Sequence, residues 1–176
     1  EIYTLSLHDA LPIFDSGRRG ALMISIDCHH PDLEEFINLK TQDEICTKAN
    51  ISVRVTDDFM KAVENDEDWV MDFYRPESDQ HITKTKKARD IFRLLALRNW
   101  EWAEPGILYW DRIQNYNLLD NTDFQYAGVN PCAEEPLPAF GSCLLGSLNL
   151  SEFVKNPFTK NACVDFEALE QAVYTA

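Results

Sequence analysis

The amino-acid sequence predicts an α/β protein, because short apolar or β-branched runs alternate with segments of helical periodicity. Residues 21–28 (ALMISIDC) form a compact apolar run that is typical of a buried strand. Residues 51–55 (ISVRV) alternate in β-branched residues, which predicts a second strand. Between Lys86 and Ala103, apolar residues recur at helical spacing over the longest such stretch of the chain. Strands and helices therefore share one mixed domain.

The segments between these three elements follow from local signals. His29, His30 and Pro31 end the first strand, and a short helix follows in which three apolar residues share one face: Leu33, Phe36 and Ile37. Residues 40–50 are polar and predict a loop. After the second strand, Thr56 or Asp57 caps a helix, whose apolar residues are Phe59, Met60 and Val63.

The second half of the chain is less regular. Residues 65–83 are charged around Trp69, and we expect no regular element there. We interpret the basic residues that follow as the solvated start of the long helix: Lys84, Lys86, Lys87 and Arg89. Pro105 and Gly106 end that helix, and an extended piece (107–109) and a turn of helix (111–116) come next. Residues 130–138 predict an irregular loop, and Asp165 caps a last helix.

Composition excludes several classes of function. The formal net charge of −14 would repel a phosphate backbone, so we expect no nucleic acid polymer as a ligand. The sequence contains no run of about 18 apolar residues, so we expect no membrane-spanning helix. The five cysteines form an odd set without a C-x-x-C pair. That pattern favours a reducing compartment, and we expect the protein in the cytoplasm.

One stretch carries residues suited to chemistry: Asn130-Pro131-Cys132-Ala133-Glu134-Glu135-Pro136-Leu137-Pro138. Its prolines disfavour a helix, and we therefore expect extended chain, in which Asn130, Cys132 and Glu134 project to the same side. A thiol can exchange a hydrogen atom, a carboxylate can accept a proton, and an amide can orient hydroxyl groups. Cys143, after a Pro/Gly turn, could form a redox pair with another cysteine.

A structural interpretation of the same residues remains open at this stage. Asn-Pro commonly opens a turn, Glu is usually solvated, and a lone Cys is most often a small buried hydrophobic residue. Spacing alone slightly favours this interpretation, and it permits the chemistry without demonstrating it.

The stretch resembles the active-site finger loop of ribonucleotide reductase large subunits, most closely the adenosylcobalamin-dependent class II branch. The likeness continues in GSCLLGSLNL (141–150) and upstream in RRGALM (18–23), HPD (30–32), ANISV (49–53) and EPGI (104–107), in the same order. It covers about residues 17–176. The resemblance implies a ten-stranded α/β barrel with the finger loop threaded through its centre.

The resemblance also implies a role for each residue of the site. Cys132 would become a thiyl radical, Glu134 would be the general base, and Asn130 would hydrogen-bond the substrate hydroxyls. Cys143 would be one member of the dithiol that supplies the reducing equivalents. By position, residues 42–50 match the loop that responds to an allosteric nucleotide, with Lys48 and Asn50 as its candidate residues. Alternatively, Lys48 and Asn50 are residues of an ordinary surface loop, and the sequence does not favour one interpretation over the other.

The cofactors and partners follow from the same resemblance. The radical would come from adenosylcobalamin or, alternatively, from a separate metal-containing subunit, and the finger loop favours cobalamin. The partners would be a ribonucleotide, with a diphosphate favoured, an allosteric nucleoside triphosphate, a thioredoxin-like reductant and a second copy of the full-length chain. The product would serve DNA synthesis.

The chain also departs from the family's pattern. The dithiol partner of Cys143, the phosphate-binding turn and the C-terminal shuttle cysteines are not matched. We therefore expect residues 14–176 to be a fragment of the catalytic barrel domain that is inactive alone. Residues 1–13 match one translated frame of a common sequencing-library adapter, and Phe14 fits the remaining nucleotide. We expect that segment to be non-native; a genuine N-terminal arm is the alternative.

A function from another class is also compatible with the sequence. Cys28, His29 and His30 with Cys46 suggest a zinc-stabilised or helical interaction module without catalysis. However, the spacing matches no standard zinc finger, so structural cysteines and a His-Pro helix entry are favoured. We expect Cys163 to be inert and the four tryptophans to be packing residues.

Overall fold

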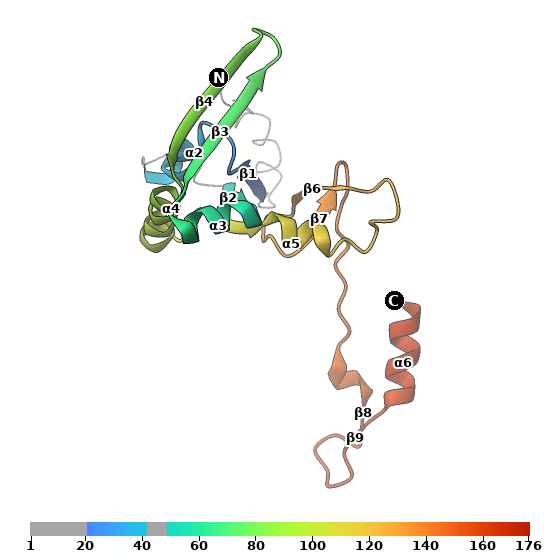
Figure 1. Cartoon of the computed structure of the whole chain (residues 1–176). Coiled ribbons are helices and arrows are strands. Elements are labelled where there is room, and N and C mark those ends of the chain that lie inside the picture. The colour runs from blue at the N-terminus through green and yellow to red at the C-terminus, as the bar shows by residue number, and fades with distance from the viewer. Residues whose placement is uncertain (1–20, 42–48) are drawn as a thin grey trace, which may run out of the picture. The chain divides into compact units, whose positions relative to one another are not determined.

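The computed structural model describes residues 21–41 and 49–176, which divide into two compact units. The first unit runs to Gly141 and the second covers Ser142–Ala176 (Figure 1). The predicted N-terminal segment 1–13 and the candidate residue Lys48 lie outside the described residues. No helix in the described part of the chain has the length and apolar character needed to cross a membrane.

The first unit is built on a three-stranded parallel sheet. Its order is β1 (Leu22–Asp27), β2 (Ala49–Val55) and β5 (Gly106–Tyr109), with β2 in the centre. Ile24 of β1 pairs with Ile51, and Ser52 pairs with Gly106 of β5. Parallel neighbours need crossover connections, and helices occur in both crossovers here. The mixed α/β class is therefore confirmed, although this sheet is open and does not form a closed barrel within the described residues.

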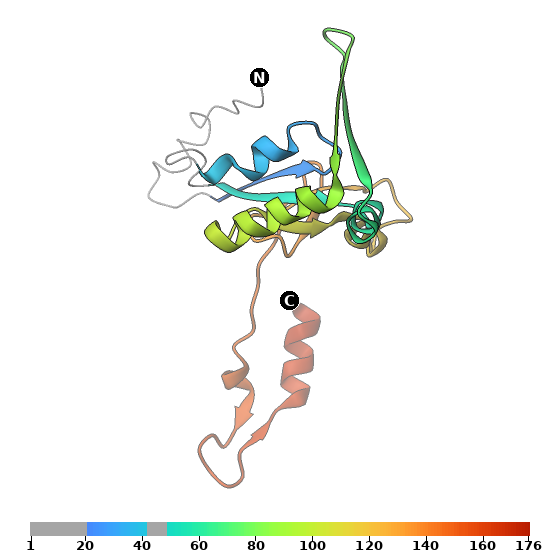
Figure 2. The ribbon, with the colours of Figure 1, turned by 60° about the vertical axis from the view of Figure 1, so that its left-hand side comes forward.

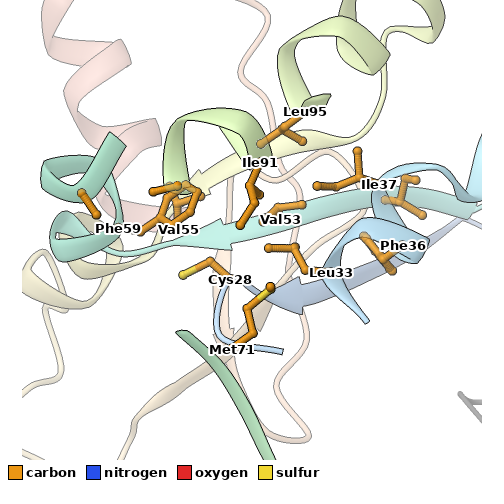
Figure 3. Close-up of a cluster of buried hydrophobic side chains, with 13 residues drawn as sticks. Cys28, Leu33, Phe36, Ile37, Val53, Val55, Phe59, Met71, Ile91 and Leu95 are labelled. Carbon is orange, nitrogen blue, oxygen red and sulfur yellow. The ribbon is translucent and has the colours of Figure 1, made fainter. Parts of the chain in front are cut away.

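Helices α2 (Leu33–Ile37), α3 (Asp57–Asn65) and α4 (Ala88–Trp102) supply side chains to one hydrophobic core against the sheet (Figure 3). The alternate residues Ile51, Val53 and Val55 of β2 are all buried, as the period of two in a strand requires. Leu33 of α2, Phe59 of α3, and Ile91 and Leu95 of α4 are each at most 1% exposed. The core therefore fixes β2 and the helices that follow it. A single-turn helix, η1 (Leu39–Thr41), follows α2.

The expectation that residues 65–83 would be irregular was wrong. Strands β3 (Asp68–Arg75) and β4 (Gln80–Lys87) form an antiparallel hairpin that projects from the first unit (Figure 2). Its charged residues support pairing, because Asp68 lies opposite Lys87 and their side chains form a 2.8 Å ion pair. In the first half of β3, Trp69 and Met71 point to the core side between exposed neighbours, and Met71 lies fully inside the core.

The same hairpin corrects the start of the long helix. Lys84, Lys86 and Lys87 belong to β4, and α4 begins at Ala88 instead of Lys86. The three lysines are paired with acidic side chains of α2 and β3 instead of forming the solvated first turn of a helix. Helix α5 (Trp110–Asn115) and the strand pair β6 (Tyr126–Val129) and β7 (Pro136–Pro138) complete the first unit.

The second unit contains a 3-10 turn, a two-stranded ribbon and a helix: η2 (Leu150–Phe153), β8 (Val154–Lys155), β9 (Cys163–Val164) and α6 (Phe166–Thr175). As predicted, Asp165 caps the last helix, and its side chain accepts a hydrogen bond from the Ala168 N–H. Residues 141–149 carry no helix or strand.

Candidate active site

The candidate residues lie on the loop that joins β6 to β7. These strands are antiparallel, and residues 130–135 connect them as a compact turn. The Ala133 N–H donates to the Asn130 carbonyl at 2.9 Å, which closes a β-turn with Pro131 and Cys132 at its centre. Proline is favoured at the first central position of such turns, because its ring fixes the backbone angle that the turn needs.

Asn130 and Glu135 close the base of this loop. The Asn130 N–H donates to the Glu135 carbonyl at 3.0 Å, and the Glu135 N–H donates back to the Asn130 side-chain oxygen at 3.0 Å. Ala133 adopts a left-handed backbone with φ of 68°. The loop is therefore held by its own hydrogen bonds and by the strands on either side.

The expectation of extended chain across residues 130–134 was wrong. Pro131 does exclude a helix, but it fits the centre of a β-turn as well as a strand, and the turn forms here. Asn130, Cys132 and Glu134 consequently do not alternate along a strand. The Asn130 side-chain oxygen faces back toward the Glu135 backbone, while Cys132 is exposed within the turn.

Glu134 lines a cavity of about 620 Å³ beside the turn. The other lining residues come from β5, α5, the residues after α5, β6 and β7, and they include Tyr109, Arg112, Tyr116 and Tyr126. The Arg112 guanidinium lies 5.5 Å from the centre of the Tyr109 ring. A carboxylate, a guanidinium and several aromatic rings thus share one cavity, and these groups can bind a polar small molecule by charge, hydrogen bonds and stacking.

Arg112 and the tyrosines of this cavity were not among the residues singled out from the sequence. A signal exists, because Tyr109, Arg112 and Tyr116 recur at spacings that share one side of a helix. That spacing says nothing of the β6–β7 turn, which brings Glu134 to the same cavity from about twenty residues downstream.

Asn50, predicted in a polar loop, lies in strand β2. Its side-chain amide donates a 2.6 Å hydrogen bond to the carbonyl oxygen of Pro131. This bond links the central strand of the sheet directly to the turn that carries Cys132. Nothing in the sequence pairs these two residues, which are 81 positions apart.

Cys143 belongs to the second unit and is partly exposed in a segment without helix or strand. The four described cysteines, Cys28, Cys132, Cys143 and Cys163, are free thiols. Cys163 is exposed.

The residues of the zinc hypothesis are partly described. Asp27, Cys28 and His29 bring three potential ligand atoms within 4.8 Å of one another. The His29 Nδ1, however, is 2.7 Å from an Asp27 carboxylate oxygen, and burial raises the pKa of the Cys28 thiol to about 11. A metal is bound by the thiolate, so this environment opposes metal binding by Cys28. Cys46 lies outside the described residues.

Known proteins resemble this chain along almost its whole length. The family model described as "Ribonucleotide reductase, barrel domain" matches residues 13–176. A protein of Thermoplasma acidophilum named vitamin B12-dependent ribonucleoside-diphosphate reductase is 38% identical over 160 residues, which cover 90% of this chain and 20% of that protein.

Two further relatives carry similar names. A vitamin B12-dependent ribonucleotide reductase of Streptomyces clavuligerus is 31% identical, over 89% of this chain and 18% of its own length. A vitamin B12-dependent ribonucleoside-diphosphate reductase of Mycobacterium tuberculosis is 29% identical, over 90% of this chain and 22% of its own length. The chain thus spans about a fifth of the length of these curated relatives. Since the barrel-domain match runs from residue 13 to residue 176, this chain belongs to the ribonucleotide reductase family.

Proposed function

We propose that this chain is the part of a ribonucleotide reductase catalytic subunit that carries the radical cysteine, and that the whole enzyme reduces ribonucleotides to deoxyribonucleotides for DNA replication. The observation that supports this most directly is the placement of Cys132 and Glu134. Cys132 is exposed on a hydrogen-bonded turn, and Glu134, two residues later, lines a cavity of a size that suits a small ligand.

In the proposed reaction, the Cys132 thiyl radical takes the hydrogen atom from the ribose 3′ carbon and becomes a thiol. Glu134 accepts the proton of the 3′ hydroxyl, and the 2′ hydroxyl leaves as water after it takes up a proton from a dithiol that includes Cys143. That dithiol supplies two electrons and two protons in all, its second hydrogen goes to the 2′ carbon, and it ends as a disulfide while Glu134 returns its proton to the 3′ oxygen. The Cys132 thiol then returns its hydrogen atom to the 3′ carbon. Asn130 would hydrogen-bond the substrate hydroxyls through its side-chain amide.

We propose adenosylcobalamin as the cofactor, since the relatives above are named vitamin B12-dependent. When bound, it would supply the radical that starts the reaction at Cys132. A separate metal-containing subunit is the alternative radical source. The names of two relatives support a ribonucleoside diphosphate as the substrate.

The complete enzyme that we propose is a ten-stranded α/β barrel with residues 130–138 in its central finger loop. It would form a homodimer in the cytoplasm, accept electrons from a thioredoxin-like protein and respond to an allosteric nucleoside triphosphate. The segment at Lys48 and Asn50 is a candidate for the allosteric response. The parallel order β1-β2-β5 supports the barrel, because each open edge of this sheet can pair with a further parallel strand. We expect residues 14–176 to be inactive by themselves.

Replacement of Cys132 in a full-length reductase that contains this segment tests the proposal. Cys132→Ala should abolish deoxynucleotide formation, because no other side chain of the site forms the radical that takes the 3′ hydrogen atom. Binding of the ribonucleotide should be retained. Cys163→Ala is the matched control, since Cys163 is also exposed but lies in the second unit, and it should keep full turnover. Turnover by Cys132→Ala above the uncatalysed rate would exclude the proposed function.

A further inference from the structure

The turn that carries Cys132 is tied to the sheet through Asn50. Within the described residues, one hydrogen bond connects residues 130–135 to the three-stranded sheet, and it runs from the Asn50 amide to the Pro131 carbonyl. That carbonyl belongs to the peptide bond between Pro131 and Cys132. Because a peptide unit is planar, the direction of this carbonyl fixes the orientation of the whole Pro131–Cys132 peptide plane, to which the Cys132 nitrogen and Cα belong.

Asn50 is held firmly on the sheet side of this bond. It pairs with Met23 of β1 in the parallel register, and its neighbour Ile51 is 1% exposed in the core. On the other edge of β2, the strand β5 begins only opposite Ser52. One residue earlier, the Ile51 N–H donates at 3.1 Å to the carboxylate of Glu104, which takes the place of a strand neighbour.

Glu104 is itself fixed by a cation. The Lys40 ammonium forms an ion pair with the other carboxylate oxygen of Glu104, and both side chains are less than a quarter exposed. The start of β2 is thus held by β1 on one edge and by the pair of Glu104 and Lys40 on the other. Because the backbone of Asn50 is held on both edges, its side-chain amide has little freedom to move. The hydrogen bond can therefore fix the position of the Pro131 carbonyl.

The turn needs such a contact from outside. Its internal hydrogen bonds join Asn130 to Glu135 at the base of the loop and join the Ala133 N–H to the Asn130 carbonyl. Pro131 has no N–H, and the described structure shows no hydrogen bond from the Cys132 backbone or thiol. Without the Asn50 amide, the Pro131–Cys132 peptide could rotate while the base of the loop stays closed, as it does between common turn types.

We infer that Asn50 is a positioning residue for Cys132, whose side-chain amide fixes the Pro131–Cys132 peptide and so the direction of the thiol. This inference rests on the proposed function of Cys132. It gives Asn50 a role in orienting the Cys132 thiol, and this role does not require an allosteric nucleotide. Because Asn50 is exposed and its bond competes with water, the contact contributes more to orientation than to stability.

The test uses a full-length reductase that contains this segment, with the variants Asn50→Ala and Asn50→Asp. Asn50→Asp keeps the size of the side chain but places a carboxylate against the Pro131 carbonyl, so it provides a second measurement if the alanine variant folds poorly. Both variants should lower kcat about 10- to 100-fold with the KM for the ribonucleotide within about twofold, because misplacement of a reacting group by about 1 Å has effects of this size.

Amide hydrogen exchange provides a readout that does not need turnover. The amides of Ala133 and Glu135 should exchange about three- to tenfold faster in the Asn50 variants, as expected for the loss of one supporting hydrogen bond. Exchange in β1 and β2 should not change. Asn99→Ala is the matched control, because the Asn99 amide also donates to a backbone carbonyl, that of Pro105 at 3.0 Å, away from the turn. It should leave kcat and the exchange of residues 130–135 unchanged.

The outcomes separate this inference from the proposed function. Unchanged exchange at Ala133 and Glu135, or faster exchange with an unchanged kcat, would overturn the positioning role. A loss confined to KM would also overturn it, because it would assign Asn50 to substrate binding. Retained turnover in Cys132→Ala would instead refute the proposed function, and the exchange measurement would still decide whether Asn50 holds the turn.

Discussion

The indole N–H of Trp69 donates a 2.8 Å hydrogen bond to the carbonyl oxygen of Cys28, which joins the β3–β4 hairpin to the end of β1. The Trp69 ring also lies against two further rings, with centroid distances of 4.6 Å to His29 and 5.1 Å to Phe59. One side chain of the hairpin therefore contacts the end of a sheet strand and helix α3. The hairpin is anchored at its base through this residue.

Substitution of Trp69 should measure this anchor. Trp69→Phe keeps an aromatic ring but removes the N–H donor, so the free energy of unfolding should fall by about 0.5–1.5 kcal/mol. Urea denaturation of the chain measures the change. Trp100→Phe is the control, because Trp100 is 82% exposed and should change stability by less than about 0.5 kcal/mol. Equal effects of the two substitutions would show that the Cys28 hydrogen bond contributes nothing.

The elements that were predicted correctly carry their own local signal. The helix after Thr56 has a capping side chain, since the Thr56 hydroxyl accepts from the Phe59 N–H at 3.1 Å, and its apolar residues recur on one face. The strand at residues 51–55 alternates in β-branched residues, and its three β-branched residues are all buried, although Ser52 between them is buried too. In both segments the local preference and the tertiary packing agree, so the sequence was sufficient.

The hairpin was missed because its stabilising contacts cross between strands. Lys87 and Asp68 pair only once the register is set, and neither residue by itself favours a strand. The turn at residues 130–135 was missed for a related reason. Proline excludes a helix without distinguishing a strand from a β-turn, and the choice depends on Glu135, whose N–H reaches the Asn130 side chain. Contacts between distant segments, such as Asn50 with Pro131, have no counterpart in local sequence.

Glu134 is expected to act as the general base, and Glu134→Gln tests that role in a full-length reductase. Glutamine has the same size but does not accept a proton, so kcat should fall by about 10²- to 10⁴-fold while the KM for the ribonucleotide changes little. Steady-state kinetics at saturating nucleotide measure the change. Glu77→Gln, in the exposed turn of the β3–β4 hairpin, is the control and should have wild-type kinetics. A Glu134→Gln enzyme with the wild-type kcat would remove Glu134 from the proton transfer.

The stabilisation that Asp165 gives to the start of α6, as its N-cap, should be lost at acidic pH. Its pairing with Lys155 at 2.7 Å, together with the Ala168 N–H, holds the pKa of this carboxyl below its usual value. A lowered pKa stabilises the folded form at pH values above the ordinary aspartate range, and the stabilisation is lost as the pH falls through the folded pKa. A carboxyl-carbon NMR titration should therefore give a midpoint below 3.8.

Removal of the lysine provides the check on this titration. Lys155→Ala should move the Asp165 midpoint upward, because the strongest interaction with the ionised carboxylate is lost. Lys160→Ala removes a lysine of the same unit from outside this ion pair and should leave the midpoint in place. A midpoint that is the same in all three proteins would show that the ion pair does not form in solution.

Cys28 should be the least reactive of the described cysteines. It is 0% exposed, and burial raises the pKa of its thiol from 9.0 to about 11, so at pH 8 its thiolate population is lowered about 100-fold. Iodoacetamide at pH 8, followed by peptide mass spectrometry, should label the exposed Cys132 and Cys163 first and Cys28 only after unfolding. Because the folded pKa is raised, the thiol stabilises the fold fully below pH 9, and this stabilisation is lost as the pH rises toward 11. Cys28→Ala should lack that alkaline loss in urea denaturation, and labelling of Cys28 at the rate of Cys163 in the folded chain would contradict its burial.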